Sequence, residues 1–381
     1  MDFLFTEEQE RLREEIREFC KREVPKINFE ELEEKDEFPS IYDKKIAEQG
    51  WIKRVLPKEY GGNGGGLMEF AIICEELMKG GYPETYLITI FNTLNLIHHG
   101  NEKQRQTYIP KIINGEIVLS ISMTEPNAGS DIASLKTRAV LEGDSFVLNG
   151  QKTFATRAAP KNNVIILAAR TSDTVPKHKG ISMFLVPADT AGLTFRKIDT
   201  MGRRIDGTYE IFLDNVRVPK DNLLGKLNEG WKILISGLDV ERAIISIRYV
   251  GWGERILNDC LEYLRHRKAQ GWTFSNKKDI LGKLADMESY LEQARVLTYK
   301  ILWMVNEEKP CTKEAAITKY YVSELVKRMA DLGMEITGGY GYLKGSPMER
   351  HYRESRIMTI TGGSSNIMLT IIARMMGLNV K

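Results

Sequence analysis

Residues 209–219 read YEIFLDNVRVP, a short run rich in β-branched and aromatic side chains. Four more runs of this kind precede it, namely VLSISM (118–123), SFVLNG (145–150), NVIILAA (163–169) and ISMFLVP (181–187). The side chains follow a period of two, and Gly, Asp, Asn or Pro bounds each run, which is typical of short strands. This pattern favours an antiparallel sheet or barrel over alternating βαβ units. We therefore predict a small antiparallel β-barrel or sandwich domain over residues 119–225.

Helical patterns flank this β region on both sides. On the N-terminal side, Thr6 and Gln9 have the spacing of a capping box, and apolar residues follow at helical intervals. Helical patterns cover 40–49, 67–79, 84–98 and 102–113 before the β region, and 228–268, 277–307, 312–337 and 364–376 after it. The later segments are long with short links, which predicts an antiparallel bundle. We therefore predict an α+β multidomain protein with an N-terminal all-α domain (1–118), a β domain (119–225) and a C-terminal four-helix bundle (226–381).

The composition indicates a soluble globular protein. The 381 residues include 54 Lys and Arg against 52 Asp and Glu, a formal net charge of +2, and 42% of them are hydrophobic. These values exclude a disordered or collagen-like chain, and the near-neutral balance argues against a nucleic-acid-binding protein. No apolar run approaches the ~20 residues that span a bilayer, so we expect no membrane segment.

The cysteines, the histidines and the N-terminus bear on metal binding and location. The four cysteines form no C-x-x-C pair and the five histidines lack H-E-x-x-H or paired spacing, so no metal site is expected. Isolated cysteines indicate buried thiols in a reducing compartment. Because MDFLFTEEQERLREE meets acidic residues at once, unlike a signal or transit peptide, we expect a cytoplasmic protein, or a matrix-like location if a leader was removed.

Two segments are dense in small hydrogen-bonding groups. On spacing alone, MTEPNAGSD (123–131) favours a tight turn held by Asp and Ser over a loop that presents hydroxyl and N–H groups to a cofactor. In NGQKTFAT (149–156), Phe154 either packs or stacks on a ring. The glycine run at 61–66 does not fit G-x-G-x-x-G and indicates a turn before a helix. The P-loop and G-x-S-x-G motifs are absent, so Rossmann, P-loop and α/β-hydrolase chemistry is disfavoured.

Four long segments resemble the flavin-dependent acyl-CoA dehydrogenases: MTEPNAGSD, NGQKTFAT, MGRRIDGTYEIFLDNVRVP (201–219) and ITGGYGYLKGSPMERHYRESRI (336–357). The N-terminal FTEEQ…REF segment and LPKEYGG extend the resemblance over nearly the whole chain, in order. The resemblance implies an enzyme that uses FAD to oxidise the Cα–Cβ bond of an acyl-CoA to the enoyl-CoA. It also implies an electron-transferring flavoprotein as the acceptor, and a homo-oligomer, expected as a tetramer of two dimers. The predicted α–β–α order is also that of this family.

The resemblance implies which residues surround FAD and substrate. Thr124 would donate to the edge of the flavin ring, Thr156 would bond near N5, and Phe154 lies where relatives often place Trp against the isoalloxazine. Ser130 would lie near the phosphates, and Arg267 would reach the pyrophosphate of a neighbouring subunit's FAD. The other expected cofactor-binding residues are Ile121, Met123, Glu335, Gly338, Gly339, Ser364 and Asn366, and those for substrate are Ser130, Asp239 and Arg242.

The chain departs from the family pattern at three places. The usual R-x-x-F-G is RKAQG (267–271), without the aromatic residue, and Glu335 stands where Gln is common. The loop that often carries the catalytic glutamate as I-Y-E-G-T reads ITGGS (360–364), with Gly362 in place of the glutamate.

A carboxylate elsewhere is then needed to take the α proton. Isovaleryl-CoA and crotonobetainyl-CoA enzymes place their base on a helix, in an L-D-x-E-R type of segment, and this chain has LDVER (238–242). A solvated charge pair is the simplest interpretation of Glu241, but the missing loop carboxylate favours its role as the catalytic base. Gly362 would leave room at the α carbon, while its N–H polarises the thioester carbonyl.

Other interpretations remain open. The same fold acting mainly as an enoyl-CoA reductase, or on a cyclic or crotonobetaine-like CoA ester, is consistent with these motifs. A non-catalytic, DNA-associated relative is disfavoured, because such relatives carry an extra C-terminal domain and a basic surface. Arg157 lies where relatives usually have Asn or Ser, and an exposed arginine is favoured over one that pairs with a carboxylate on a substrate or partner.

Overall fold

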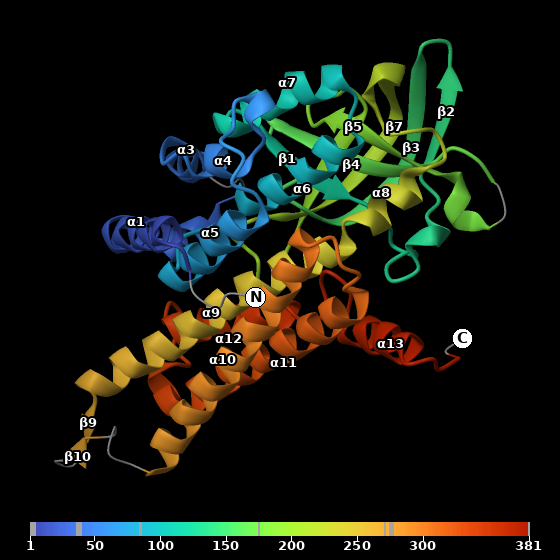
Figure 1. Cartoon of the computed structure of the whole chain (residues 1–381). Coiled ribbons are helices and arrows are strands. Elements are labelled where there is room, and N and C mark those ends of the chain that lie inside the picture. Colours follow the sequence, from blue (N-terminus) through green and yellow to red (C-terminus); the bar gives the residue numbers. More distant parts are fainter. Residues whose placement is uncertain are drawn as a thin grey trace. The chain divides into compact units, whose positions relative to one another are not determined.

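The computed structural model describes residues 5–35, 40–83, 86–173, 176–269, 272–273 and 278–379. The chain forms two compact units, each assembled from separate stretches of sequence (Figure 1). Unit 1 comprises Met1–Glu30, Leu67–Pro83 and Asp239–Lys381, and unit 2 comprises Glu31–Gly66 and Glu84–Leu238. The β region therefore lies in unit 2, and the N-terminal helices are divided between the units. The division of the chain at 118 and 225 stays a prediction.

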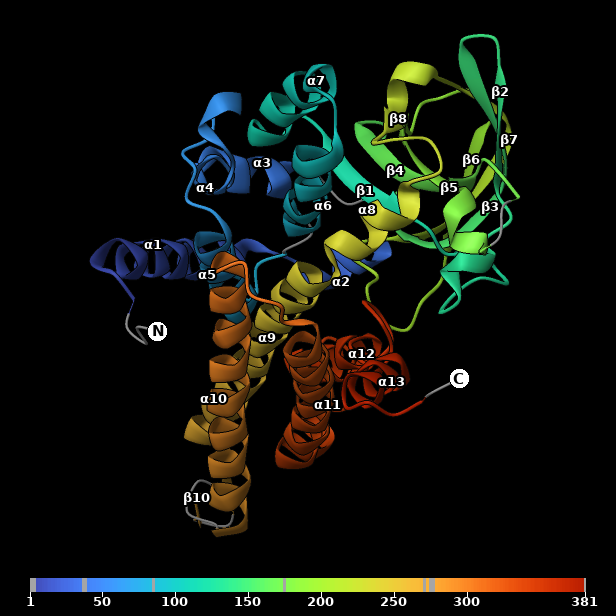
Figure 2. The same ribbon diagram turned by 45° about the vertical axis from the view of Figure 1, so that its right-hand side comes forward.

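Unit 1 is built from helices. They are α1 (Glu7–Glu23), η1 (Val24–Lys26), α5 (Leu67–Gly80), α9 (Leu238–His266), α10 (Lys278–Asn306), α11 (Thr312–Thr337), η7 (Gly338–Tyr340), α12 (Pro347–Ile357) and α13 (Ser365–Met375). A short hairpin of β9 (Lys268–Ala269) and β10 (Trp272–Thr273) follows α9. Helix α11 packs against α10, α12 and α13, while α5 packs against α1 and α10 (Figure 2). The predicted capping box is confirmed, since the Thr6 and Gln9 side chains accept each other's backbone N–H.

Close helix crossings in unit 1 depend on glycines. At Gly251 of α9, a Cβ atom would lie 2.4 Å from the carbonyl oxygen of Glu75 on α5. At Gly333 of α11, it would lie 2.4 Å from the sulfur of Met348 on α12. Gly251 needs the smallest residue because backbone atoms already occupy the space of a side chain, whereas a side chain at Gly333 would displace the end of Met348.

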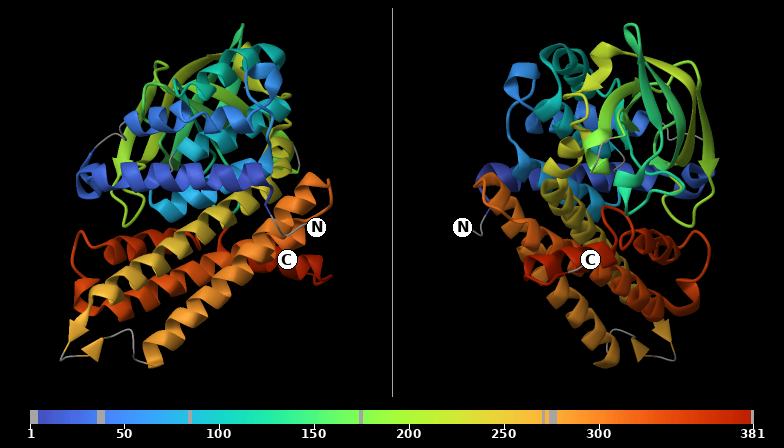
Figure 3. Two further views of the ribbon diagram at one scale, coloured as in Figure 1. Left: turned by 60° about the vertical axis from the view of Figure 1, so that its left-hand side comes forward. Right: turned by 90° about the vertical axis from the view of Figure 1, so that its right-hand side faces the viewer.

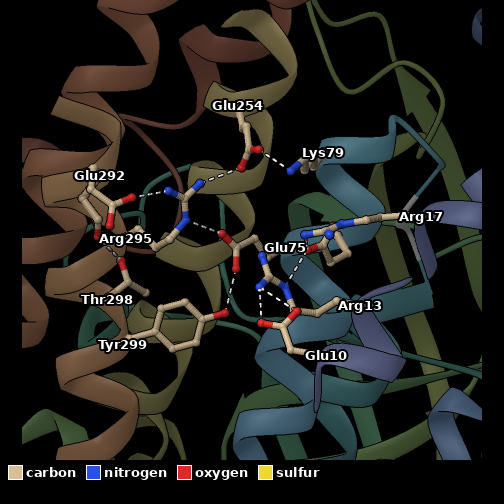
Figure 4. Close-up of polar contacts among 12 residues, drawn as sticks. Glu10, Arg13, Arg17, Glu75, Lys79, Glu254, Glu292, Arg295, Thr298 and Tyr299 are labelled. Atoms are coloured by element: carbon tan, nitrogen blue, oxygen red, sulfur yellow. Dashed lines mark hydrogen bonds and ion pairs between the residues drawn. The ribbon is translucent and has the colours of Figure 1, made fainter. Parts of the chain in front are cut away.

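Two adjacent carboxylates on α5 connect this helix to its neighbours (Figure 4). Glu75 accepts hydrogen bonds from Arg295 Nε at 2.8 Å and from the Tyr299 hydroxyl at 2.6 Å, both on α10. Glu76 accepts from Arg13 Nε at 2.8 Å and Arg17 Nη2 at 2.7 Å, both on α1. Because both carboxylates are almost fully buried, these charge-assisted bonds fix the positions of three helices relative to one another.

Unit 2 contains an eight-stranded sheet and shorter helices. The helices are α2 (Phe29–Glu34), which begins at the end of the preceding stretch of unit 1, α3 (Ile41–Glu48), α4 (Trp51–Val55), α6 (Tyr86–His99), α7 (Glu102–Ile113) and α8 (Gly230–Ser236). The strands are β1 (Val118–Ser122), β2 (Arg138–Glu142), β3 (Ser145–Thr156), β4 (Asn163–Arg170), β5 (Ile181–Pro187), β6 (Leu193–Ile198), β7 (Thr208–Pro219) and β8 (Leu223–Leu224). The turns η2 (Lys58–Tyr60), η3 (Ile132–Ser134), η4 (Lys177–Gly180) and η5 (Lys220–Asn222) join these elements.

The sheet follows the order β6-β7-β3-β2-β4-β5-β8, and β1 pairs with β4. Its strands, coloured from green to yellow, are seen from two further sides in Figure 3. Most neighbours are antiparallel, as predicted, but β1 and β4 run parallel from Val118↔Asn163 to Ser122↔Leu167. Helix α6 packs on β1, where Asn92 Nδ2 donates to the Leu119 carbonyl at 2.8 Å. Apolar side chains of β3, β4, β5 and β7, such as Leu148, Phe184 and Ile211, form the buried core.

The predicted fold class is confirmed, with some differences in the elements. The helix predicted at 228–268 divides at Gly237 into α8 and α9, and α12 was not predicted. Strands β2, β6 and β8 were also not predicted, since their short sequences lack a sustained apolar pattern. The first residues of the helices predicted at 84–98 and 277–307 lie outside the described residues. Within the described ranges, no helix is long and apolar enough to cross a bilayer.

Candidate active site

The first turn of α9 carries Glu241 and is tied to the start of α11. Asp239 Oδ1 accepts a hydrogen bond from Arg242 Nη1 at 3.0 Å, and its other oxygen accepts from the Thr312 hydroxyl at 2.6 Å. The structure therefore places the two predicted substrate residues of unit 1, Asp239 and Arg242, in one ion pair beside Glu241. These bonds hold the turn that orients the Glu241 side chain.

The electrostatic surroundings of Glu241 suit a proton acceptor. Its side chain is half-buried, and burial raises the pKa of its carboxyl above the ordinary value, while the nearby Arg242 and Lys319 charges oppose this rise. A carboxylate with a raised pKa is a stronger base than one in water. Glu241 is thus a half-buried carboxyl that faces two cationic groups, not one half of a solvated pair.

The loop between α12 and α13 brings Gly362 against the same side of α9. A Cβ atom on Gly362 would lie 2.6 Å from Cδ1 of Ile245, which is one helical turn after Glu241. The backbone φ angle of Gly362 is +64°, in the left-handed region that favours glycine. The conformation favours a glycine and an added side chain would displace the end of Ile245, so the residue that replaces the family's loop glutamate lies next to the helix that carries Glu241.

Ser364 and Asn366 lie at the start of α13. The Ser364 hydroxyl caps the helix by accepting from the Ile367 N–H at 3.4 Å, and the Asn366 side chain is exposed. These two predicted cofactor residues therefore follow directly after the Gly362 loop.

A second group of predicted residues lines a hollow of about 470 Å³ in unit 1. Arg267, Glu335, Gly338 and Gly339 all contribute to it, together with aromatic residues that include Tyr340. The Arg267 guanidinium lies 4.9 Å from the centre of the Tyr340 ring. A Cβ on either glycine would meet no other atom within 4 Å. Arg267 can bind a phosphate, Tyr340 can contact a flat ring, and Gly338 and Gly339 leave space for both. The hollow therefore fits a phosphate with an attached flat ring.

Glu335 forms an ion pair with a residue of α10. Its carboxylate accepts a hydrogen bond from Lys283 Nζ of α10 at 2.6 Å. Gln270, which stands where R-x-x-F-G has its aromatic residue, lies outside the described residues.

In unit 2, the segment 123–131 forms a tight turn with a buried carboxylate at its centre. Glu125 and Ala128 exchange backbone hydrogen bonds of 3.1 and 3.0 Å. The Glu125 carboxylate accepts from the Lys136 and Thr137 N–H groups at 2.6 and 2.8 Å, and from Lys152 Nζ at 2.8 Å. The turn is confirmed, but the Glu125–Lys152 pair stabilises it more directly than the Asp and Ser that the sequence suggested.

The predicted cofactor residues around this turn are accessible. Ile121, Met123 and Thr124 are half-buried at the end of β1 and after it, and Ser130 is exposed. The Met123 carbonyl accepts from Lys152 Nζ at 3.1 Å and the Thr124 carbonyl accepts from the Thr153 N–H at 2.9 Å. Backbone atoms thus fix the loop and leave the Thr124 and Ser130 hydroxyls available.

Phe154 and Thr156 lie at an irregularity of β3. The register with β7 shifts between Lys152 and Ala155, and Phe154 adopts a φ angle of +55°. The Phe154 side chain is 64% exposed, although it is large and apolar. An exposed ring on the same strand as Thr156 fits stacking on a flat heteroaromatic ring, as FAD offers, and the Thr156 hydroxyl fits hydrogen bonding to such a ring.

Arg157 differs from the prediction. It is buried, 2% exposed, because both of its terminal nitrogens donate to the Asp43 carboxylate, at 3.0 and 2.6 Å. The favoured interpretation of an exposed arginine is therefore wrong, and the guanidinium pairs with a carboxylate of its own unit. Asp43 lies 114 positions away in the chain, so no local pattern indicates this pair.

Sequence reasoning also missed Lys319. It is fully buried in α11, and its Nζ donates to the carbonyl oxygen of Gly363 at 2.6 Å. The available signal is a single lysine within the otherwise apolar and small stretch AAITKYYV (315–322).

Three domain families match the chain. The acyl-CoA dehydrogenase N-terminal domain matches residues 6–116, the middle domain residues 120–216, and the C-terminal domain residues 228–377. The chain therefore belongs to the acyl-CoA dehydrogenase family, whose members are FAD-dependent oxidoreductases and are typically tetramers.

Similar proteins cover the whole chain. It is 36% identical over 378 residues to the probable acyl-CoA dehydrogenase YngJ of Bacillus subtilis, covering 98% of this chain and 99% of that protein. It is 34% identical over 376 residues to the caffeyl-CoA reductase-Etf complex subunit CarC of Acetobacterium woodii, with 98% and 99% covered. The crystal structure of an acyl-CoA dehydrogenase from Geobacillus kaustophilus superposes with a TM-score of 0.92 at 30% identity, covering 99% of this chain and 100% of that one.

Proposed function

We propose that this protein oxidises the Cα–Cβ bond of an acyl-CoA thioester to the enoyl-CoA, with Glu241 as the base that removes the α proton. The observation that supports the assignment most is the contact between Gly362 and Ile245, one turn from Glu241. The Gly362 loop, which lacks the family's glutamate, therefore lies against the first turns of α9, the helix that carries Glu241.

The chemistry follows from the properties of these groups. The α proton of a thioester is weakly acidic, and a base with a raised pKa in a region of low polarity removes it more readily. The Gly362 N–H polarises the thioester carbonyl and stabilises the negative charge that develops there. FAD, when bound, supplies the acceptor for the hydride from the β carbon.

The residues proposed to bind FAD occur in each of the two units. Those in unit 2 are Ile121, Met123, Thr124, Ser130, Phe154 and Thr156, and those in unit 1 are Ser364 and Asn366. Arg267, Glu335, Gly338 and Gly339 line one hollow and are proposed to be supplied together by a second copy of the chain. Ser130, Asp239 and Arg242 are proposed to contact the acyl-CoA. The shared cofactor would make the protein an obligate homo-oligomer, in line with the tetramers typical of the family.

The acceptor and the location are also proposed. An electron-transferring flavoprotein is the proposed acceptor, since the similar CarC is named as a subunit of a reductase-Etf complex. A cytoplasmic location is proposed because all four cysteines are free and buried.

The test is the variant Glu241→Gln, which keeps size and packing but cannot accept a proton. We expect turnover to fall by about 10²–10⁴-fold. Flavin content and the unfolding midpoint should stay unchanged. Glu262→Gln is the matched control, because Glu262 is an exposed carboxylate on the same helix that pairs with Arg265 and His266. Near-normal turnover by Glu241→Gln would contradict the assignment.

Reduction of an enoyl-CoA is the second candidate, since CarC is named as a reductase subunit. A cyclic or crotonobetaine-like CoA ester is a further possible substrate class. Turnover of saturated, branched, aromatic and cyclic acyl-CoA esters with an artificial acceptor, compared with turnover of the matching enoyl-CoA esters with a reduced donor, distinguishes the directions.

A further inference from the structure

Lys319 is a fully buried ammonium group to which the proposed chemistry gives no role. Its Nζ donates to the carbonyl oxygens of Gly363 at 2.6 Å and Met358 at 3.2 Å. Among the described residues, carbonyl oxygens satisfy this ammonium, and no carboxylate lies within ion-pair distance of it. Lysine is rarely fully buried without an ion pair, so the position needs an explanation.

The contacts of Lys319 place it behind the Gly362 loop. Its Cε atom lies 4.0 Å from the point that a Cβ on Gly362 would occupy. Its two acceptors, Met358 and Gly363, lie on either side of Gly362 in the sequence, so one side chain fixes both ends of the turn.

A second side chain of α11 holds the same loop from the other end. Glu324 accepts from the Ser365 hydroxyl at 2.6 Å, and the Ser365 N–H donates to the Thr359 carbonyl at 3.0 Å. The loop is thus fastened to α11 at two points, of which only Lys319 lies next to Gly362.

Lys319 also acts on the charge of Glu241. Within unit 1, the charged groups that face Glu241 are Arg242 from α9 and Lys319 from α11, and Glu324 of α11 in turn faces Lys319. Residues 357–373, which include the loop and most of α13, contain no charged side chain. The pKa of Lys319 is lowered to about 8, because burial and, to a lesser extent, Arg242 lower it more than Glu241 and Glu324 raise it.

We propose that Lys319 is a positioning residue for the dehydrogenation: it holds the Gly362 loop in place through two carbonyl oxygens, and its positive charge favours the ionised form of Glu241. The inference rests on the proposed function of Glu241 as the base. It assigns Lys319 no contact with the substrate.

The first test separates charge from hydrogen bonding. Lys319→Gln removes the charge but keeps an N–H donor, and Lys319→Arg keeps the charge but changes the geometry. The base works only when ionised, so turnover rises with pH through the pKa of Glu241. Loss of an opposing positive charge raises that pKa, so the acid limb of kcat in Lys319→Gln should move up by about one pH unit. In Lys319→Arg the limb should stay in place while kcat falls.

Arg328→Gln is the matched control, because it removes one positive charge from an exposed position on the same helix. Its acid limb should not move. Hydrogen exchange of the 359–365 amides gives a readout that is independent of turnover, and it should be faster in the Lys319 variants than in the control.

The outcomes distinguish the two claims. If Glu241→Gln abolishes turnover but Lys319→Gln leaves both the acid limb and the loop exchange unchanged, the inference about Lys319 is overturned and the proposed base stands. If Glu241→Gln retains turnover, the proposed function fails first. Should Lys319→Gln not fold, an unchanged kcat together with unchanged loop exchange in Lys319→Arg would equally overturn it.

Discussion

The guanidinium of Arg157 donates to both carboxylate oxygens of Asp43, at 3.0 and 2.6 Å, and both side chains are at most 2% exposed. The pair joins the end of β3 to α3 within unit 2. Two buried charges of this kind stabilise the fold only as long as both are present, because a single remaining charge has no solvent to compensate it. Arg157 is therefore a structural residue of unit 2.

Asp43→Asn should destabilise the protein by about 3–5 kcal/mol, because it leaves Arg157 buried without a counter-charge. The free energy of unfolding in urea measures this loss. Asp173→Asn provides the control, since Asp173 and Arg138 form an equally short but exposed pair at 2.7 Å in the same unit. That substitution should cost about 0–1 kcal/mol. Equal losses in the two variants would contradict the buried-pair argument.

Glu125 gives unit 2 a dependence on acid. Burial raises the pKa of its carboxyl, but the Lys152 charge and the hydrogen bonds from Lys152, Thr137 and Lys136 outweigh this, so the folded pKa lies below the ordinary 4.5. The unfolded chain therefore binds this proton first as pH falls. The stability that Glu125 contributes is complete above pH 4.5 and is lost as pH drops through the folded pKa.

Glu125→Gln should cost about 3–5 kcal/mol at pH 7, because Lys152 loses its counter-charge. The difference from the unaltered protein should shrink as the pH of the urea titration is lowered towards 4. The substitution Glu125→Gln should also weaken flavin binding, because the Glu125–Lys152 pair holds the loop that carries Thr124. Glu142→Gln, at an exposed pair with Arg217, should change neither quantity. A difference that stays constant with pH would show that Glu125 does not act through its charge.

Gly362 has no room for a methyl group. Gly362→Ala should destabilise the loop by about 1–3 kcal/mol, because the new Cβ meets Ile245 Cδ1 and the φ angle is unfavourable. Ile245→Val deletes this δ carbon, so the double variant should recover part of the loss. Gly377→Ala is the control for backbone strain alone, with a φ of +87° and no neighbour within 4 Å of a Cβ. A double-mutant cycle of unfolding free energies checks the coupling, and strictly additive losses would argue against the contact.

The same contact limits a rescue of the missing base. Gly362→Glu in the Glu241→Gln background should restore little turnover alone and more when Ile245→Val is added, because the added side chain then has space. Single-turnover flavin reduction by acyl-CoA measures the recovery. Equal recovery with and without Ile245→Val would mean that the loop moves freely.

Arg267→Ala should release flavin. A charge-assisted bond to a phosphate contributes about 1.5–3 kcal/mol, so flavin affinity should fall roughly 10–100-fold. Because the arginine is proposed to reach a second copy, the oligomer should also loosen on size-exclusion chromatography. Arg265→Ala is the control two residues away, in an exposed pair with Glu262. Full flavin occupancy in Arg267→Ala would remove Arg267 from the cofactor site.

Much of the fold was predictable because it depends on local patterns. The period-two runs of β4 and β5 are buried along almost their whole length, and the capping box at Thr6 needs only residues three apart. Strand β2 was missed because its sequence RAVLE leaves Val140 and Leu141 both exposed, which breaks the alternation that signals a half-buried strand.

The candidate site was only partly predictable, for a similar reason. Glu241 and Gly362 were identified from motifs, since each lies in a short segment that resembles known enzymes. Lys319 and Asp43 belong to no such segment, and their partners are 39 or more positions away. A lysine in the sequence of α11 looks the same whether its side chain faces solvent or donates to two carbonyl oxygens. Only the three-dimensional structure distinguishes the two cases.

The two carboxylates of α5 also bear on the order of events during synthesis. Unit 2 is complete once residue 238 has left the ribosome, whereas unit 1 needs residues 239–381 to surround α5. Domains generally fold as units while the chain emerges. Until Arg295 and Tyr299 have been synthesised, Glu75 has no partner from α10. Helices α1 and α5 then lack the rest of unit 1 to pack against. Unit 2 is therefore expected to fold before α1 packs into the completed unit 1.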